Sequence, residues 1–393
     1  MRAMPRVLQQ VDRSLRFLHK QRRRALLRAV GALVVGGGSL WLSALGRAVE
    51  GPVLRKHAIK MVDRLLGNRA IQASRVEIYR AVAALLLRGA RQAVVLVDIT
   101  QVRPGKYALT ASLAMNGRGV PIYSQVRSQG AISKKASIAA FLRALKRVLP
   151  EGIEAVLVTD AGFESPWFDQ VAEHGWHYVG RVRHLTKFQL DGKWVGVKQL
   201  HRRARPWVEC LGHLLFPRCR PRSRRIVLAP KPQSKHRFRM TKRRRKGCSQ
   251  TDARCVSSAR EPWVLATSLE RPSHVIVEIY ALRMQIEQNY RDHKNHRWGW
   301  RLDQTRSRSS ERLSMLLLIA AIAMCVVLAF GCLAERQHLQ RRYQANTLSS
   351  RRVLSFFTLG LFVLRDALSP LRAGPSLLFA EIRSRIWQLP MTA

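Results

Sequence analysis

Two hydrophobic periodicities divide the chain into regions. Over residues 1–88, apolar side chains recur every three or four positions between Lys and Arg residues, which is the spacing of amphipathic helices. Three consecutive glycines at 36–38 interrupt this pattern and predict a break between helices. The sequence therefore predicts an N-terminal helical domain over residues 1–88, and the basic side chains make it a candidate for DNA binding, against the alternative of a bundle with a solvated basic face.

A different pattern begins near residue 92, where short apolar and β-branched runs alternate with helical segments. Asn116-Gly117-Arg118-Gly119 separates two of these runs and is a hairpin signal. The order is three antiparallel strands, then helix, strand, helix, strand, which is the element order of a ribonuclease H-like core. We therefore expect an α/β fold with a mixed five-stranded sheet and flanking helices. The segments are 92–100, 107–115, 119–127, 133–150, 154–160, 165–175 and 177–184.

The expected core is discontinuous. Its first part covers residues 89–185, and a basic, β-rich insertion follows at 186–260. The insertion contains the tract KHRFRMTKRRRKG at 235–247, which has no apolar spacing and predicts a mobile loop. The second part of the core, 261–340, holds a strand and a long helix over 271–294. Residues 341–393 predict C-terminal helices with a role in dimerisation.

The longest apolar run, residues 313–334, allows two interpretations. About 20 apolar residues are enough to span a bilayer, so a single membrane span is one of them. The other is a buried helix that packs on the sheet. We favour the buried helix and expect no membrane partner, because a span would leave the charged motifs described below without a role.

The net charge indicates a polyanionic partner. The chain has 70 Lys and Arg against 24 Asp and Glu, which gives a formal charge of +46. Such an imbalance opposes a compact fold by self-repulsion unless a polyanion is bound. Nucleic acid fits best because phosphate contacts dominate its affinity for proteins, and anionic lipid is the alternative.

Three carboxylates lie at positions where an acid either costs folding free energy or has a function. Asp98 lies inside an apolar strand, Asp160 ends another, and Glu287 lies on the following long helix. An ionised carboxylate in an apolar strand needs either an Arg or Lys partner or a metal ion. The strands of Asp98 and Asp160 are neighbours in the expected fold, so we predict that the three carboxylates converge on two Mg²⁺ ions for phosphoryl transfer.

The helix that carries Glu287 has a charged stripe. At about 100° per residue, Arg283, Glu287 and Lys294 lie at roughly 300°, 340° and 320° from Tyr280, if positions 280–294 form one helix. A stripe that faces a hydrophobic core would be apolar, so we expect this one to face a charged partner.

These residues carry a family resemblance. Positions 280–294 match Y-x₂-R-x₃-E-x₆-K, and the chain resembles the insertion-sequence-four (IS-four) family of DDE transposases, which has this signature. The strands of Asp98 and Asp160, the segment EPWVLATSL at 261–269, and ALGRA followed by KHAIKMVDRLLGN near the N-terminus are also similar. The resemblance covers nearly the whole chain.

The resemblance implies cut-and-paste movement of a bacterial insertion sequence, with strand cleavage, a DNA hairpin and strand transfer. Asp98, Asp160 and Glu287 would bind two Mg²⁺ ions, for which Mn²⁺ could substitute. The partners would be double-stranded DNA, as terminal inverted repeats and target, and a second copy of the chain in a homodimer. The location would be the bacterial cytoplasm, in association with the nucleoid.

The resemblance also implies a set of DNA contacts. Tyr280, Arg283 and Lys294 would hold phosphates near the cut, and Trp263 would receive a flipped base. Arg181 and Arg183, at the end of the fifth strand, could touch phosphate or lie on a solvated edge. Two alternative functions are an inactive DNA-binding derivative and a ribonuclease H-like nuclease without strand transfer.

Overall fold

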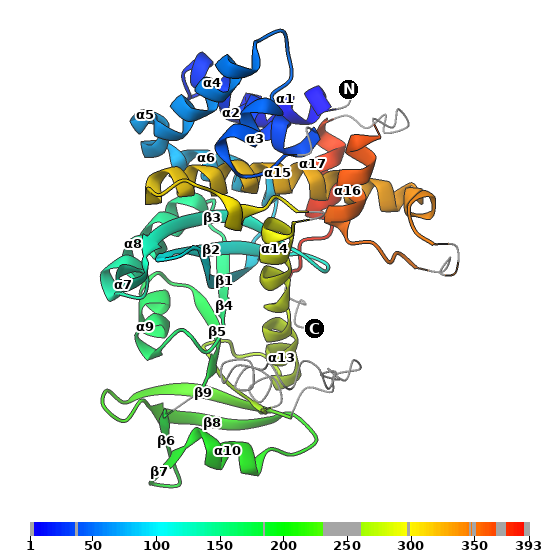
Figure 1. Cartoon of the computed structure of the whole chain (residues 1–393). Helices are drawn as coiled ribbons and strands as arrows, with labels where there is room; N and C mark the ends of the chain where they lie inside the picture. Colours follow the sequence, from blue (N-terminus) through cyan, green and yellow to red (C-terminus); the bar gives the residue numbers. More distant parts are fainter. Residues whose placement is uncertain are drawn as a thin grey trace, which may run out of the picture. The chain divides into compact units, whose positions relative to one another are not determined.

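The computed structural model describes residues 4–35, 38–183, 185–230, 261–296, 299–345, 347, 351–366 and 375–388. It divides into two compact units (Figure 1). The first unit combines Met1–Ala155 with Leu282–Ala393, and the second is Val156–Ala281. The basic tract at 235–247 lies outside the described residues.

The N-terminal helices belong to the first unit together with the strands that follow them. The expected break at the glycines is confirmed, because one helix ends at Val35 and the next begins at Leu42. The helices are α1 (Met4–Ser14), α2 (Lys20–Val35), α3 (Leu42–Arg47), α4 (Arg55–Gly67), α5 (Arg69–Ala73) and α6 (Arg75–Leu86).

Three antiparallel strands follow in the order β3-β2-β1: β1 (Gln92–Arg103), β2 (Lys106–Ala114) and β3 (Gly119–Ser128). The predicted hairpin is confirmed between β2 and β3, where Gly117 has a φ of +85°. Asp98 pairs with Thr110, and Thr110 pairs with Ser124. A polar line therefore crosses these strands. Helices α7 (Gln129–Ile132) and α8 (Lys135–Val148) complete this part of the unit.

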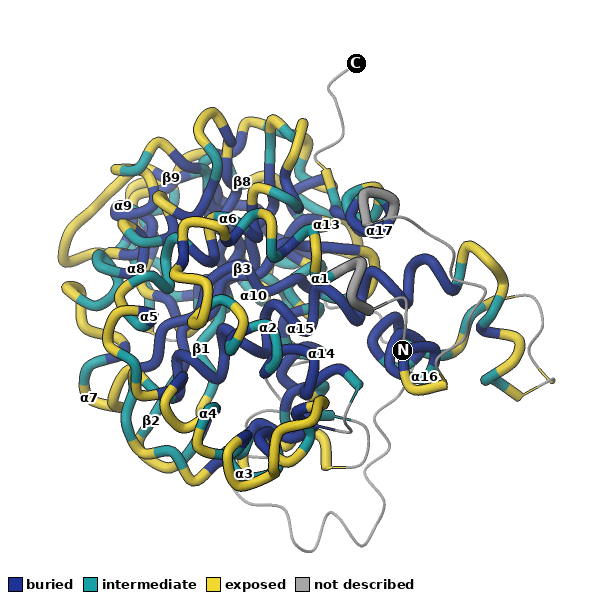
Figure 2. The backbone as a smooth tube through the Cα atoms, turned by 90° about the horizontal axis from the view of Figure 1, so that it is seen from above, coloured by how far each residue is buried: buried dark blue, intermediate teal, exposed yellow. Residues whose placement is uncertain are grey.

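The apolar run predicted at 313–334 is the central helix of the first unit, α15 (Ser310–Arg336). Every residue from Leu313 to Ala334 is buried (Figure 2). The helix lies between the N-terminal helices and β3 (Figure 1), and the Ser314 hydroxyl accepts a hydrogen bond of 3.1 Å from the Val126 amide of β3. Within the described residues it is the one helix whose length and composition would suffice to cross a membrane. Its complete burial favours the interpretation as a core helix.

One C-terminal helix packs on α15 through glycines. A Cβ atom at Gly331 would lie 2.0 Å from the Phe356 carbonyl oxygen, and one at Gly360 would lie 2.0 Å from the Val327 carbonyl oxygen. The close approach of α15 to α16 (Phe356–Arg365) therefore requires glycine at both positions. The remaining elements here are α17 (Pro375–Arg383) and two short 3-10 helices, η1 (Leu302–Gln304) and η2 (Leu339–Arg342).

The second unit is a mixed sheet in the order β4-β5-β10-β9-β8-β6-β7, with β4 and β5 parallel. Short strands were expected between 186 and 230 and are present, together with an unpredicted helix, α10 (Val197–Arg203). The strands are β4 (Glu154–Thr159), β5 (His177–Val182), β6 (Lys187–Leu190), β7 (Lys193–Gly196), β8 (Glu209–Phe216), β9 (Arg222–Ala229) and β10 (Trp263–Thr267). The other helices are α9 (Ser165–Glu173) and α13 (Ser273–Ala281).

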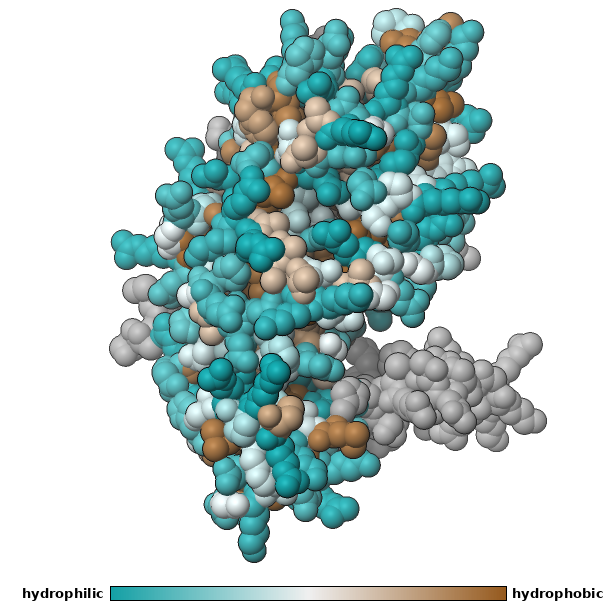
Figure 3. Space-filling model, turned by 90° about the vertical axis from the view of Figure 1, so that its left-hand side faces the viewer, coloured by the Kyte–Doolittle hydropathy of each residue, from teal (hydrophilic) through white to brown (hydrophobic). Residues whose placement is uncertain are grey.

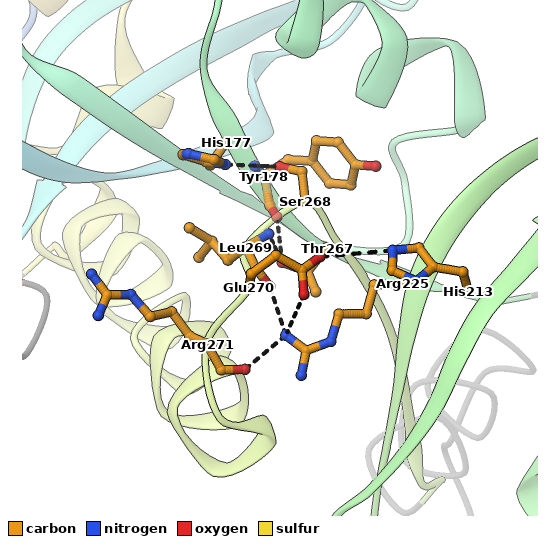
Figure 4. A network of polar contacts seen from close by, with 9 residues as sticks. All are labelled: His177, Tyr178, His213, Arg225, Thr267, Ser268, Leu269, Glu270 and Arg271. Carbon is orange, nitrogen blue, oxygen red and sulfur yellow. Dashed lines mark hydrogen bonds and ion pairs between the residues drawn. The ribbon is translucent and has the colours of Figure 1, made fainter. Parts of the chain in front are cut away.

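A polar network fixes the link between β10 and α13 (Figure 4). The Arg225 guanidinium donates to the carbonyl oxygens of Leu269 and Arg271, both at 2.7 Å. The Thr267 hydroxyl donates to the Tyr178 carbonyl at 2.9 Å. Strands β9 and β5 therefore hold this link from two sides, which sets where α13 begins.

The predicted helix over 271–294 is two helices, so the single-helix expectation was wrong. Helix α13 ends at Ala281, and α14 (Met284–Lys294) begins after a turn at Leu282 and Arg283. The predicted positions around the helix axis apply from Arg283 to Lys294, because Arg283 already has helical φ and ψ. They do not apply to Tyr280, which lies on the preceding helix. The domain ranges 1–88, 89–185, 186–260, 261–340 and 341–393 stay predictions. In the first compact unit, α15 packs with the N-terminal helices, β3 and the C-terminal helices.

Candidate active site

In the first unit, α14 packs on the strand that carries Asp98. The Tyr290 hydroxyl donates to the Asp98 backbone carbonyl at 3.1 Å, and Lys294 Nζ donates to the Thr100 hydroxyl at 2.8 Å. The Asp98 side chain is half-buried, and one carboxylate oxygen accepts from the Ile99 amide at 2.8 Å. These bonds place one face of α14 over the Asp98–Thr100 segment of β1.

Glu287 lies on that same face of α14. Arg283, Glu287, Tyr290 and Lys294 have the i, i+4, i+7, i+11 spacing of one helical stripe. Glu287 lies one turn before Tyr290, whose hydroxyl meets the Asp98 carbonyl, on the face of α14 that packs on β1. Arg283 and Glu287 form an ion pair of 2.8 Å, with 16% and 36% of their side chains exposed. The carboxylate is thus held by a guanidinium and remains open to solvent.

Lys294 is half-buried at the other end of the stripe. Burial lowers its pKa, and the charges of Asp303 and Asp98 oppose that effect. Its Nζ lies 5.9 Å from the centre of the Tyr290 ring. A cation in contact with both β1 and the Tyr290 ring can attract a phosphate to the Asp98 end of the strand.

The opposite face of α14 is anchored to the β2–β3 turn. The Met115 amide donates to the Gln285 side chain at 2.7 Å, and Arg118 donates to Asp292 at 2.8 Å. Both members of the Arg118–Asp292 ion pair are largely buried, with 17% and 13% of their side chains exposed. The position of α14 is therefore set by β1 on one side and by this turn on the other.

Asp160 belongs to the second unit and directly follows β4. One of its carboxylate oxygens accepts a hydrogen bond of 2.8 Å from the Gly162 amide. A Cβ atom at Gly162 would lie 3.0 Å from that oxygen, so a larger residue would crowd the carboxylate. This local turn orients Asp160 at the end of an otherwise buried strand.

Four of the predicted DNA contacts gather in the second unit. The rings of Trp263 and Tyr280 meet edge to face, with centroids 4.8 Å apart. Arg181 is buried, and it contacts Glu261 at 3.5 Å, while Arg183 contacts the same carboxylate at 2.8 Å. Burial lowers the pKa of Arg181, and a hydrogen bond to Tyr280 and the charge of Glu261 oppose that change. The expectation of a solvated edge therefore does not describe Arg181.

The donor atoms suit a hard divalent cation, because the candidate ligands are carboxylates. Within the part of the chain that the structure describes, no three His, Cys, Asp or Glu side chains form a ready metal site. Asp98 and Glu287 belong to the first unit and Asp160 to the second. The convergence of the three carboxylates therefore stays a prediction.

The chain matches the family described as Transposase DDE domain over residues 91–326. The match begins just before β1, ends within α15 and covers more than half of the sequence. The chain belongs to the DDE transposase family. A search of curated proteins finds no match. Membership makes DNA the partner of this transposase and agrees with its basic composition.

Sequence reasoning missed two residues in this transposase. Tyr290 lies on the Glu287 stripe and ties α14 to β1, and its position three residues after Glu287 was a usable signal. Glu261 forms ion pairs with both Arg181 and Arg183, and only the strand pairing of β10 with β5 shows this. Both residues act by holding other site residues in place.

Proposed function

We propose that this transposase carries out cut-and-paste transposition of a bacterial insertion sequence, as a member of the IS-four family with the Y-R-E-K signature. The hydrogen bond from Tyr290 to the Asp98 carbonyl is the main support, because it joins the helix of Glu287 to the strand of Asp98. In this proposal, β1 to β5 form a ribonuclease H-like core.

Asp98, Asp160 and Glu287 would hold two Mg²⁺ ions, and Mn²⁺ would substitute for them. When bound, such ions activate the attacking oxygen and stabilise the leaving oxygen of phosphodiester chemistry. Arg283 would orient Glu287 through their ion pair, and Tyr290 would fix the distance between α14 and β1.

The DNA steps follow from the proposed family. Water cleaves one strand at the element end, the freed 3′-hydroxyl attacks the other strand to form a hairpin, water opens the hairpin, and the 3′-hydroxyl joins target DNA. Lys294, Arg283 and Tyr280 would contact phosphates, together with Arg181 and Arg183. Trp263 would stack on a flipped base.

Recognition of the element ends would come from the N-terminal helices. We propose that the α1–α6 region binds the terminal inverted repeats and that two copies of the chain assemble on DNA in the bacterial cytoplasm, in association with the nucleoid. The distributed Lys and Arg residues would supply non-specific affinity that falls steeply with salt.

The proposal is tested by incubating the full chain with Mg²⁺ and DNA that carries the sequences flanking the gene. We expect Asp98→Asn, Asp160→Asn and Glu287→Gln each to lower nicking by about 10³-fold, because several kcal/mol of charge stabilisation is lost. Asp98→Cys should regain activity with Mn²⁺ but not with Mg²⁺, because a thiolate is a softer ligand than a carboxylate.

A matched control is Glu173→Gln, which removes an exposed acid from α9. This variant should nick normally, and every variant should bind DNA in EDTA. Equal nicking by wild type and Asp98→Asn would remove the catalytic assignment. Nicking without hairpin or joined products would instead identify a nuclease that lacks strand transfer.

A further inference from the structure

Trp207 is unusually exposed for a tryptophan. It lies in the segment between α10 and β8 of the second unit, and 59% of its surface is open to solvent. By contrast, Trp167 and Trp300 are fully buried, and Trp263 packs against Tyr280. A large exposed aromatic surface is costly in water, and tryptophan is enriched at binding interfaces.

Three exposed arginines lie close to Trp207 in the chain, and one of them contacts its ring. The Arg205 guanidinium carbon lies 5.7 Å from the centre of the Trp207 ring. Arg202 and Arg203, at the exposed C-terminal end of α10, precede it in the chain. Among the residues that the structure describes, none of these three arginines forms an ion pair, so all three charges are available to an anionic partner.

The local backbone restricts how this group is displayed. Pro206 fixes its own φ and disfavours helical conformations for Arg205, so α10 does not continue, and the chain bends at Pro206 and Trp207. The Ala204 amide closes the helix by donating to the His201 carbonyl at 3.3 Å. Arg205 and Trp207 meet across Pro206, whose ring restricts the backbone between them, and this reduces the entropy lost when a ligand binds.

The same helix reaches the cluster of predicted DNA contacts. His201 of α10 is half-buried, and the charges of Glu261, Arg181 and Arg183 act on it. Helix α10 thus joins the Trp263–Tyr280 cluster to the Trp207 segment within one compact unit. The face of the molecule in Figure 3 is mostly hydrophilic, with separate small hydrophobic patches.

We infer that Trp207 and Arg205, with Arg202 and Arg203, form a second DNA site that binds unpaired nucleotides. The indole ring stacks on a base, and the guanidinium groups contact the neighbouring phosphates. This combination of aromatic faces and cations is how proteins hold single strands without reading their sequence. The inference rests on the proposed function, since transposition opens the duplex near each cut.

The test compares two ligands of the full chain in EDTA, a single-stranded oligonucleotide and the matching duplex, by fluorescence anisotropy. Trp207→Ala should weaken single-strand binding by roughly 5- to 150-fold, and duplex binding should change less than about twofold. Trp207→Phe should keep most of the affinity. Arg205→Met should flatten the salt dependence of single-strand binding by about 0.7 in log–log slope.

Leu185→Ala is the matched control, because Leu185 is an apolar residue of the same unit that is 94% exposed. It should leave both affinities unchanged. Equal losses on both ligands with Trp207→Ala, or no loss on either, would overturn the inference. A change of oligomeric state in Trp207→Ala would also overturn it, by assigning the ring to a protein contact. Binding is measured in EDTA, where no cleavage occurs, so it is independent of nicking. A wild type that binds single strands in EDTA but does not nick DNA in Mg²⁺ would remove the transposition proposal and leave this site standing.

Discussion

The Tyr290 side chain binds the backbone of Asp98 and not its side chain: the phenol hydroxyl lies 3.1 Å from the Asp98 carbonyl oxygen. The bond does not use the Asp98 carboxylate, one oxygen of which accepts from the Ile99 amide. The bond fixes α14 against β1 at the level where Glu287 and Lys294 emerge from the helix. The geometry of the candidate site thus depends on a residue that has no chemical role of its own.

Tyr290→Phe should lower nicking about tenfold and leave DNA affinity in EDTA unchanged. The variant keeps the ring but leaves a half-buried carbonyl without its donor, at a cost of about 1 kcal/mol. Tyr343→Phe is the control, because the Tyr343 hydroxyl donates to Asp366 at 2.8 Å in the C-terminal region. Initial rates and thermal unfolding of both variants separate the effects. A similar loss of rate in both would show that Tyr290 only stabilises the fold.

Arg118→Ala should lower the free energy of unfolding by about 3–5 kcal/mol. The substitution leaves Asp292 buried without its partner, whereas the double variant with Asp292→Ala should lose less. Arg147–Glu77 is the control pair, since 65% and 37% of these side chains are exposed, and Arg147→Ala should cost about 0–1 kcal/mol. Urea unfolding measures all three. Equal costs for Arg118→Ala and Arg147→Ala would contradict the prediction.

The unfolding free energy should depend on pH through His293. This imidazole is buried and stacks on Trp300 with ring centres 5.4 Å apart. Burial first, and then the charge of Lys294, lowers its pKa from 6.5 to about 4. Between these values the unfolded chain takes up a proton that the folded chain does not, so stability is complete above about pH 6.5 and falls as the pH drops towards 4.

The expected loss from pH 7 to pH 5 is about 2 kcal/mol from this residue, because each pKa unit corresponds to about 1.4 kcal/mol. His293→Leu should remove that part of the pH dependence, and His19→Leu, at an exposed histidine, should not. Urea unfolding at pH 7 and pH 5 measures the free energy of unfolding of both variants and of the wild type. An unchanged slope in His293→Leu would show that other groups cause the acid sensitivity.

Glu261→Gln should strengthen DNA binding. The Glu261 carboxylate contacts both Arg181 and Arg183, so it occupies the position that a phosphate would take. Removing its charge should add about one phosphate contact, which steepens the log–log salt dependence by about 1. Glu173→Gln changes the net charge equally and should gain less. Equal gains in anisotropy titrations would mean that net charge alone is responsible.

The sequence predicted most elements correctly because their signals are local. The NGRG hairpin, the α8 and α9 segments and the strands around Asp98 and Asp160 all depend on spacing and turn residues. The break between α13 and α14 was not predictable in this way. The turn residues, Leu282 and Arg283, are neither glycine nor proline. Long-range hydrogen bonds fix each helix instead: Arg225 binds the start of α13, and Arg118 binds α14.

The candidate site was predictable as a set of residues but not as a set of contacts. The spacing of Arg283, Glu287 and Lys294 is confirmed because all three lie in α14 or at its N-cap. The roles of Tyr290 and Glu261 required knowledge of which strand each side chain meets. Charge counting could not show that Arg181 is buried against Glu261, since both residues look like ordinary surface charges in the sequence.

Burial of α15 has a consequence for the synthesis of this protein. The edge of β3 and the inner faces of α2 and α4 find their apolar partner only when residues 310–336 have left the ribosome. Until then, the N-terminal three quarters of the chain carries an uncovered strand edge and a large apolar surface. Messages that end before this helix would therefore yield aggregates, and such fragments should be cleared by proteases rather than compete with the intact protein for DNA.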